Sequence, residues 1–442
     1  MTIILIKAAQ LFLSLSILIV LHELGHFIPA KLFGTRVEKF YLFFDVKFSL
    51  FKKKIGDTVY GIGWLPLGGY VKIAGMIDES MDKDQMAQPP KPWEFRTKPA
   101  WQRLIIMLGG VFVNFVLGFV IYMMILFVWG TNYATKDDIK YGFAVTKTME
   151  QQGFQQGDRI VSVDDTPFHE MEDINTYLLF RDINTITVER ENGDIANLTV
   201  PEDIGTQLFE AGDLPAMTPR RPFQLDSVVP ESPAAKAGLL ATDELVAING
   251  KAINFLSDLT YTLKNTGITA MDLEIRRNGE NKILKVTPNE DFTIGIVTTG
   301  TDPDYVKISH RDYSLGESIT KGASLGYWKI KDYLAQFQYI FTKKGAAQVG
   351  GFAAIGNMFP ASWNWKAFWE ITAFLSIMLG VLNLMPIPAL DGGHVMFLLY
   401  EIVSGRKPGD KFMEYAQLIG FILLISLVLF ANGNDIYKAI FN

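Results

Sequence analysis

Long uncharged apolar runs lie toward both ends of this chain, and a polar stretch of ordinary composition separates them. A helix needs about 20 apolar residues to cross the hydrocarbon core of a bilayer. Four segments come close to that length and predict membrane-spanning helices: Ile3–Ile28, Leu104–Trp129, Phe368–Leu384 and Tyr415–Ala431. We therefore expect a polytopic α-helical protein in a lipid bilayer, with a large water-soluble insert between its second and third spans.

Composition narrows the classes of function. The 442 residues are 49% hydrophobic and 20% charged, and a net charge of −6 argues against nucleic acid as a partner. The chain contains no cysteine. Disulfide bonds and thiolate metal ligands are therefore excluded, and any metal site must use imidazole and carboxylate groups.

The loop after the first apolar run has the pattern of β-strands. Phe40–Phe51 and Thr58–Ile73 predict two strands joined by a lysine-rich turn, which form a membrane-associated β-hairpin or sheet. The second strand is almost free of charge, and four of its glycines are candidate substrate contacts: Gly61, Gly63, Gly68 and Gly69. Two interpretations stand. The sheet lies on the membrane surface as an amphipathic element, or its glycine-rich strand is an edge that pairs with an extended substrate.

The polar insert contains an internal repeat. The segment that begins at Gln152 parallels the segment that begins at Ala237, and each has a glycine, an acidic turn, an alternating strand and a polar turn. Two copies of one small β-rich domain are expected, and the pattern resembles PDZ domains. The predicted domains are an N-terminal membrane half (1–130), two PDZ-like domains (131–205 and 222–300), an amphipathic extracytoplasmic connection (301–367) and a C-terminal membrane half (368–442).

Basic residues predict the orientation of the chain in the membrane. Lysines and arginines are frequent between the first two spans, and Arg406, Lys407 and Lys411 lie between the last two. By the positive-inside rule, both loops are cytoplasmic. Both termini and the insert are then expected on the outer side.

The strongest chemical motif is His22-Glu23-Leu24-Gly25-His26, within the first apolar run. Residues four apart share one face of a helix, so both imidazoles can bind one metal ion. Glu23 then lies beside the metal, where its carboxylate can take a proton from an attacking water. Two histidines and a carboxylate inside a membrane are costly unless they are paired or coordinated. The motif therefore indicates a catalytic zinc site rather than a satisfied polar cluster.

Other polar residues in the later spans are candidates for the same site. A catalytic zinc needs a third protein ligand, and Asp391 is the candidate, in a segment whose two prolines and two glycines break the third span. His394 is the rival ligand, and otherwise it makes a supporting hydrogen bond or meets solvent. Asn114 and Asn383 either join helices by hydrogen bonds or hold the substrate backbone or a developing oxyanion.

These motifs, with two PDZ-like domains between the second and third spans, resemble the site-2 proteases of the bacterial RseP type over nearly the whole chain. The resemblance implies that His22, His26 and Asp391 bind Zn²⁺ and that Glu23 is catalytic. It implies cleavage of the transmembrane segments of single-span membrane proteins, typically an anti-sigma factor that another protease has already cut. It also implies a bacterial inner membrane, with the PDZ-like domains in the periplasm, where they can contact peptides or substrate, and the active site toward the cytoplasmic side.

The chain departs from the family pattern in its second span. The family often has Gly-Pro-x-x-Asn where this chain has Gly110-Val111-Phe112-Val113-Asn114. Because this stretch is not expected to touch the metal, we expect the difference to affect substrate handling rather than chemistry.

A non-enzymatic membrane protein is the alternative, either a metal transporter or an adaptor whose PDZ-like modules bind C-termini. A transporter needs no glutamate beside its first histidine, and an adaptor needs no buried histidines at all. Glu23 separates the alternatives, because only a protease depends on it.

Overall fold

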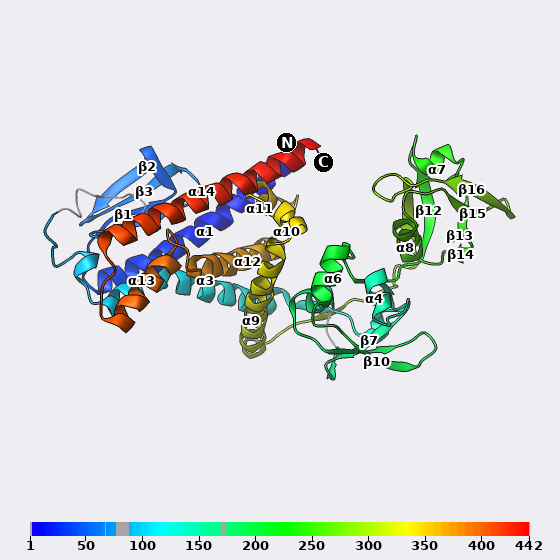
Figure 1. The fold of residues 1–442 in the computed structure, drawn as a ribbon, viewed down its shortest axis with the longest axis horizontal. Coiled ribbons are helices and arrows are strands. Elements are labelled where there is room, and N and C mark those ends of the chain that lie inside the picture. Colours follow the sequence, from blue (N-terminus) through cyan, green and yellow to red (C-terminus); the bar gives the residue numbers. More distant parts are fainter. Residues whose placement is uncertain (1, 67, 77–87, 169–173, 442) are drawn as a thin grey trace. The chain divides into compact units, whose positions relative to one another are not determined.

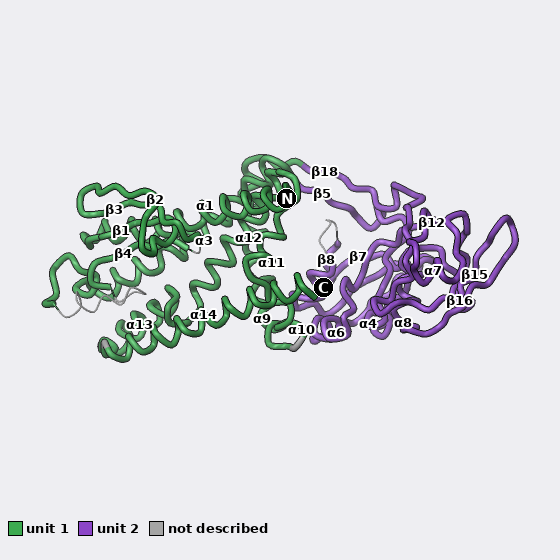
Figure 2. The backbone as a smooth tube through the Cα atoms, turned by 90° about the horizontal axis from the view of Figure 1, so that it is seen from above, with its two compact units in different colours: residues 1–130, 312–442 green, residues 131–311 purple. Residues whose placement is uncertain are grey.

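The structure is a computed structural model, and it describes residues 2–66, 68–76, 88–168 and 174–441. The chain forms two compact units, which are coloured separately in Figure 2. A helical unit comprises Met1–Gly130 and Asp312–Asn442, and a β-rich unit comprises Thr131–Arg311. The two ends of the chain therefore build one unit together, and the polar insert builds the other.

Four helices in the described residues of the helical unit are long and apolar enough to cross a membrane. They are α1 (Thr2–Leu32), α3 (Ala100–Trp129), α12 (Trp365–Leu384) and α14 (Asp410–Phe441) (Figure 1). Each contains one predicted span, and small β-sheets lie between them in the sequence, so the predicted fold class is confirmed. The helices run past the apolar segments because a charged residue ends the apolar pattern without breaking the backbone hydrogen bonds of the helix.

Helix α3 lies at the centre of this unit and packs against α1, α12, α9 (Leu315–Ile340) and α13 (Asp391–Ser404). Glycines set its closest approach to α1. A Cβ built at Gly25 would lie 2.4 Å from the carbonyl oxygen of Gly109. Small residues let helix backbones approach closely in a membrane. This pair therefore fixes the spacing of α1 and α3 one residue away from His26.

The connection between the β-rich unit and α12 is helical. The predicted amphipathic stretch forms α9, and the short helices α10 (Lys343–Gln348) and α11 (Phe352–Met358) follow it. A short 3-10 helix, η1 (Phe95–Thr97), leads into α3. Helix α11 contacts both α1 and α14, so this connection belongs to the helical unit.

The loop between α1 and α3 forms a four-stranded sheet instead of a hairpin. Its strands are β1 (Val37–Leu42), β2 (Phe44–Ile55), β3 (Thr58–Leu65) and β4 (Tyr70–Ile73), in the order β2-β3-β1-β4. Each strand predicted from the sequence is divided into two. Phe43, with a φ of +67°, separates β1 from β2, and residue 67, between β3 and β4, lies outside the described residues.

The prediction of an edge strand is wrong for β3, which contains Gly61 and Gly63. Strand β3 pairs with β2 on one side, antiparallel, and with β1 on the other, parallel. The edge nearest α1 is β4, which pairs with β1 and contacts α1. A free edge is set by which strands pair in three dimensions, so alternation along the sequence does not identify it.

The β-rich unit contains two repeats of one topology. The first has the sheet β10-β9-β7-β8, and the second has the sheet β16-β15-β13-β14. The first repeat comprises β6 (Phe143–Val145), α4 (Lys147–Gln151), β7 (Arg159–Val163), β8 (Thr166–Pro167), α5 (Ile174–Phe180), β9 (Thr185–Glu189), β10 (Ile195–Thr199), α6 (Ile204–Ala211) and β11 (Met217–Pro219). The second comprises β12 (Phe223–Val228), α7 (Pro233–Lys236), β13 (Glu244–Ile248), β14 (Lys251–Ala252), α8 (Leu256–Thr266), β15 (Met271–Arg277), β16 (Glu280–Val286) and β17 (Ile296–Gly300). Strands β5 (Thr131–Tyr133) and β18 (Ser309–Arg311) pair at the two ends of the unit's chain, next to η2 (Lys136–Asp138).

The repeats also share a buried ion pair at matching positions. Asp158 accepts two hydrogen bonds from Arg190, and Asp243 accepts two from Arg277. Each aspartate also accepts a backbone N–H three residues before it. Each repeat has its own hydrophobic core. The internal repeat read from the sequence is therefore a structural repeat as well.

Candidate metal centre

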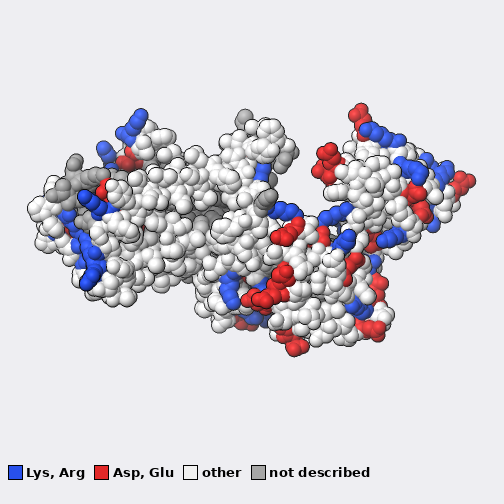
Figure 3. Space-filling view, viewed as in Figure 1, with Lys and Arg blue, Asp and Glu red and all other residues white. Residues whose placement is uncertain are grey.

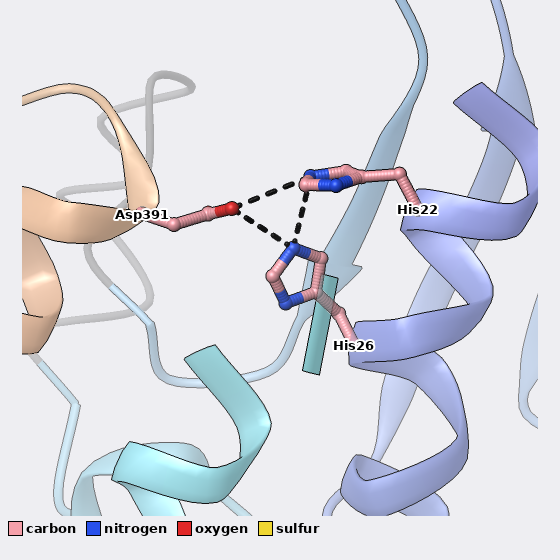
Figure 4. Close-up of side chains that lie close together, drawn as sticks. All are labelled: His22, His26 and Asp391. Carbon is pink, nitrogen blue, oxygen red and sulfur yellow. Dashed lines mark hydrogen bonds and ion pairs between the residues drawn. The ribbon is translucent and has the colours of Figure 1, made fainter. Parts of the chain in front are cut away.

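Helix α1 presents His22 and His26 on one face, and α13 brings Asp391 to them (Figure 4). The two Nε2 atoms lie 3.2 Å apart, and Oδ2 of Asp391 lies 3.3 Å from each. The three possible ligand atoms are all within 4.8 Å of one another. Residues far apart in the sequence thus converge on one point.

A break in the helices carries Asp391 to this point. Helix α12 ends at Leu384, and α13 begins at Asp391. Pro386 and Pro388 lie in the six residues between them, and proline cannot donate the backbone hydrogen bond that a continuing helix requires. The first residue of the new helix is the carboxylate.

Backbone contacts fix the orientation of His26. Its Nδ1 lies 2.8 Å from the carbonyl oxygen of Ile106. A carbonyl can only accept, so Nδ1 carries the proton and Nε2 keeps its lone pair. That lone pair is on the side of Asp391, as a metal ligand requires.

Asn114 orients His22 in a similar way. Nδ2 of Asn114 lies 3.0 Å from Nδ1 of His22. Oδ1 of Asn114 is buried and has no hydrogen-bond partner among the described residues. A 180° rotation of the amide would exchange these two atoms, and Oδ1 would then accept Nδ1–H of His22 and leave Nε2 unprotonated, as a metal ligand requires. Asn114 thus joins α3 to α1 through His22, as one of its two predicted roles requires. Contact with the substrate stays a prediction.

The donor set fits zinc. Oδ2 of Asp391 is buried and accepts no hydrogen bond from the described residues, although it faces two imidazole nitrogens. Two neutral imidazoles and one carboxylate leave a fourth tetrahedral position open, as in catalytic zinc sites. These three side chains could therefore hold a zinc ion and keep one position for the chemistry.

Comparison with known proteins identifies the group to which this centre belongs. The model of the family described as Peptidase family M50 matches residues 10–427. The chain belongs to peptidase family M50. A relative from Neisseria meningitidis whose name describes a zinc metalloprotease is 27% identical, over 96% of this chain and 97% of its own length. The regulator of sigma-E protease of Escherichia coli is 27% identical, over 97% of each chain, and that of Haemophilus influenzae is 27% identical, over 96% and 97%.

The family membership confirms the predicted enzyme class and cofactor. This M50 peptidase is a multi-pass membrane zinc metalloprotease, and its resemblance to the RseP type extends over its full length. The alternative of a non-enzymatic metal transporter or adaptor is therefore excluded.

Glu23 lies beside the cluster of the M50 peptidase and against strand β4. It interacts electrostatically with His22, His26 and Asp391. A Cβ built at Gly69 would lie 3.6 Å from Cγ of Glu23 and 2.4 Å from Cγ2 of Ile19 on α1. Gly69 therefore lets the chain just before β4 pass close to the glutamate.

Of the other three candidate glycines, Gly61 and Gly63 lie in β3, and Gly68 lies in the connection between β3 and β4. A Cβ built at Gly61 would lie 2.4 Å from the ring of Tyr41, and one at Gly63 would lie 2.2 Å from the carbonyl oxygen of Phe44. A Cβ built at Gly68 would lie 3.0 Å from the Phe44 ring. Packing against Tyr41 and Phe44 is enough to explain why residues 61 and 63 are glycines.

Two further candidates do not join the cluster. Asn383, on the last turn of α12, makes no hydrogen bond through its side chain to any described residue. His394, one turn beyond Asp391 on α13, contacts the side chain of Gln417 on α14. Asp391, rather than His394, is the residue whose ligand atom meets the two histidines.

The structure corrects our expectation for the Gly110–Asn114 stretch. A Cβ built at Gly110 would lie 2.3 Å from Nε2 of His26 and 2.7 Å from Cε1 of His22. Gly110 makes room for both imidazoles, and Asn114, one helical turn further on, contacts one of them. The stretch therefore supports the metal centre directly, whereas we expected it to affect substrate handling alone.

Sequence reasoning also missed Gln417. It is a buried amide in an otherwise apolar stretch of α14. A polar side chain within a span is the signal that could have identified it, as it identified Asn114 and Asn383.

Proposed function

We propose that this M50 peptidase is an intramembrane endopeptidase in which His22, His26 and Asp391 hold the zinc ion and Glu23 is the general base. The observation that carries the proposal is the convergence of the three ligand atoms, within 4.8 Å, beside Glu23 on a helix long enough to span a membrane. When bound, zinc lowers the pKa of water and polarises a peptide carbonyl.

The side chains of the chain supply the proton transfers and the orientation. Glu23 takes a proton from the attacking water and later gives it to the amine of the leaving peptide. The carbonyl of Ile106 holds the proton of His26 on Nδ1, and the Asn114 amide, with Oδ1 turned toward His22, would do the same for His22. Both Nε2 atoms could then bind a zinc ion. Asn383 stays a candidate for holding the substrate backbone.

The substrate class that fits is the transmembrane segment of a single-span membrane protein. Peptide bonds in a helix are shielded, so such a segment must unwind before it is cut. Strand β4 is at the edge of its sheet among the described residues, next to α1 and Glu23, and it can pair with the unwound chain by backbone hydrogen bonds. Gly68 and Gly69 precede this strand, and Gly69 lets the chain pass close to Glu23.

The similarity to the regulator of sigma-E protease supports a narrower proposal. We infer that a natural substrate is an anti-sigma factor, or a similar regulator, that another protease has already trimmed. The predicted location is a bacterial inner membrane, with both termini and the PDZ-like domains (131–205 and 222–300) periplasmic and the active site toward the cytoplasm. The PDZ-like domains can there contact substrate or peptides.

A charge asymmetry supports this orientation. Lysines and arginines gather over the end of the helical unit that carries β2, β3 and α13, whereas the middle of the visible face is almost uncharged (Figure 3). Lys52, Lys53 and Lys54 are all exposed on β2. Basic residues at one end of a span are typical of the cytoplasmic side.

The Glu23→Gln variant tests the proposal. The amide cannot take a proton, but the three ligands are unchanged, so we expect cleavage to be lost while zinc stays near one ion per chain. Membrane-protein fragments from cells with the wild-type or the variant chain would be compared by mass spectrometry. Identical fragment patterns, with the variant folded and zinc-loaded, would contradict the proposal.

A further inference from the structure

Residues 385–390, between α12 and α13, form a loop that we call the Asp391 loop. A buried amide joins helix α14 to this loop. Gln417 is 6% exposed, whereas its neighbours Leu418 and Ile419 are 40% and 64% exposed. Oε1 of Gln417 accepts a hydrogen bond from the backbone N–H of Ala389. Its amide nitrogen contacts Nε2 of His394, and because Oε1 is the acceptor, this nitrogen donates to the imidazole. One side chain thus joins α14 to the loop and to α13.

Ala389 has a backbone conformation that alanine rarely adopts. Its φ is +76°, in the left-handed region. A residue with a Cβ is strained there unless its surroundings hold it. Ala389 lies two residues before Asp391, and its N–H is the group that Gln417 binds. Gln417 therefore holds the bend from which the chain enters α13.

Gly420 brings the backbone of α14 against the same loop. A Cβ built at Gly420 would lie 1.7 Å from the carbonyl oxygen of Pro388. Gln417 and Gly420 are three residues apart, so they share one face of the helix. Both are buried, and most of the surrounding residues of α14 are exposed. This face of α14 is therefore shaped to the loop.

We propose that Gln417 is a positioning residue for the metal centre. Through the Ala389 N–H and His394, it holds the loop and the first turn of α13 so that Asp391 faces His22 and His26. The proposal rests on the proposed function, because it takes Asp391 as a zinc ligand. A ligand held in place before the ion arrives gives a tighter site than one that must be ordered on binding. Helix α14 thereby tunes zinc affinity without supplying a ligand.

Zinc affinity of the purified full-length chain tests the proposal independently of cleavage. Zinc would be titrated in competition with a chelator of known affinity. Gln417→Met keeps the length of the side chain and removes both hydrogen bonds. We expect its zinc affinity to fall about 10-fold, as for other residues that support metal ligands. Unchanged affinity in a folded Gln417→Met chain would overturn the proposal.

Gly420→Ala provides a second route to the same result. Its new methyl group would displace the carbonyl of Pro388, so zinc affinity should also fall, although Gln417 is intact. If Gln417→Met does not fold, the zinc affinity of Gly420→Ala is compared with that of the wild type instead. Wild-type zinc affinity in Gly420→Ala would then overturn the proposal.

A second substitution at Ala389 distinguishes positioning from general stability. Glycine adopts positive φ without strain. In the Gln417→Met background, Ala389→Gly should therefore recover about fivefold in zinc affinity, since the bend no longer needs the hydrogen bond. In the wild-type background, Ala389→Gly should change zinc affinity little. Glycine usually loosens a loop, so a role of Gln417 in stability alone predicts no recovery, and that outcome would contradict the proposal.

The matched control lies at the other end of α14. Asn434 donates to the backbone carbonyls of Ala346, Ala347 and Val349, which all lie outside the Asp391 loop. Asn434→Leu should keep wild-type zinc affinity, and an equal loss would mean that Gln417 only docks the helix. Asp391→Ala is measured in parallel. If it keeps its zinc, the ligand assignment fails; if it loses zinc while Gln417→Met does not, only the positioning role fails.

Discussion

At the scale of single residues, the metal centre depends on the glycine at position 110, which has no side chain, as well as on its ligands. Gly110→Ala would place a methyl group against Nε2 of His26 and Cε1 of His22. Because α3 is fixed against α1 by Gly25 and Gly109, the backbone has little room to retreat. We expect zinc affinity to fall about 10- to 100-fold, the range for residues that support metal ligands, as measured by chelator competition.

Gly118→Ala is the control on the same helix. Its Cβ would lie 2.8 Å from Cγ1 of the buried Ile377 side chain on α12. This clash involves helix packing and no imidazole, so the variant should keep its zinc. Equal losses in the two variants would show that Gly110 acts through helix packing and not through the histidines.

The residues of the proposed site differ in how far the sequence reveals them. His22, Glu23 and His26 form a local pattern on one helix, so spacing alone brings them together. Asp391 was a candidate because a broken helix with a carboxylate is unusual at membrane depth. The contacts of Gly110, Asn114 and Gln417 depend on which helices pack together, and no spacing within one helix contains that information.

At the scale of elements, each repeat of the β-rich unit is held by its buried Asp–Arg pair. In the second repeat, Asp243 is 4% exposed and binds Arg277 and the N–H of Leu240. Asp243→Asn loses the charge of this network, and we expect backbone amides of β13 and β15 to exchange about tenfold faster or more. Hydrogen exchange with mass spectrometry on the full chain would measure this.

Glu244→Gln is a neighbouring control. Glu244 pairs with Arg276, but both side chains are largely exposed, at 63% and 46%. Exposed pairs contribute little, so exchange should change by less than about threefold. A larger effect for Glu244 than for Asp243 would contradict the importance of burial here.

The same pair predicts a pH dependence. Hydrogen bonds from Arg277 hold the pKa of Asp243 below its usual range. A carboxyl whose folded-state pKa is depressed stabilises the fold above its unfolded pKa of about 3.9, and this contribution is lost as the pH falls through the folded-state value. Protection in the second repeat should therefore decline below about pH 4 in the wild type, and the Asp243→Asn chain should not show this decline.

The sheet between α1 and α3 shows what the pattern of apolar and polar residues does not predict about an element. Alternation in the sequence located extended chain at Phe40–Phe51 and Thr58–Ile73, whereas β1 begins earlier, at Val37, and β2 continues to Ile55. It did not locate the breaks, because one of them occurs at Phe43, a bulky residue at positive φ. It also did not give the strand order, which puts the glycine-rich β3 inside the sheet and β4 at its edge.

At the scale of the whole molecule, the orientation in the membrane is open to a direct test. Single cysteines can replace Lys53, Lys407 or Lys251, which are all exposed, in a chain that has no cysteine of its own. We expect an impermeant thiol reagent to label Lys251→Cys in intact cells whose outer membrane, if present, is permeabilised. Lys53→Cys and Lys407→Cys should be labelled only after the cells are lysed. The reverse pattern would place the β-rich unit in the cytoplasm.

The division of the helical unit between the two ends of the chain has a consequence for how the protein is made. The histidines are synthesised early, but Asp391 follows the entire β-rich unit. At about 5–20 residues per second, the ribosome needs on the order of half a minute to reach it. On the proposed ligand set, a nascent chain therefore holds two imidazoles without their carboxylate throughout that time. Peptidase activity can begin only when nearly all of the polypeptide has left the ribosome, so unfinished chains do not endanger neighbouring membrane proteins.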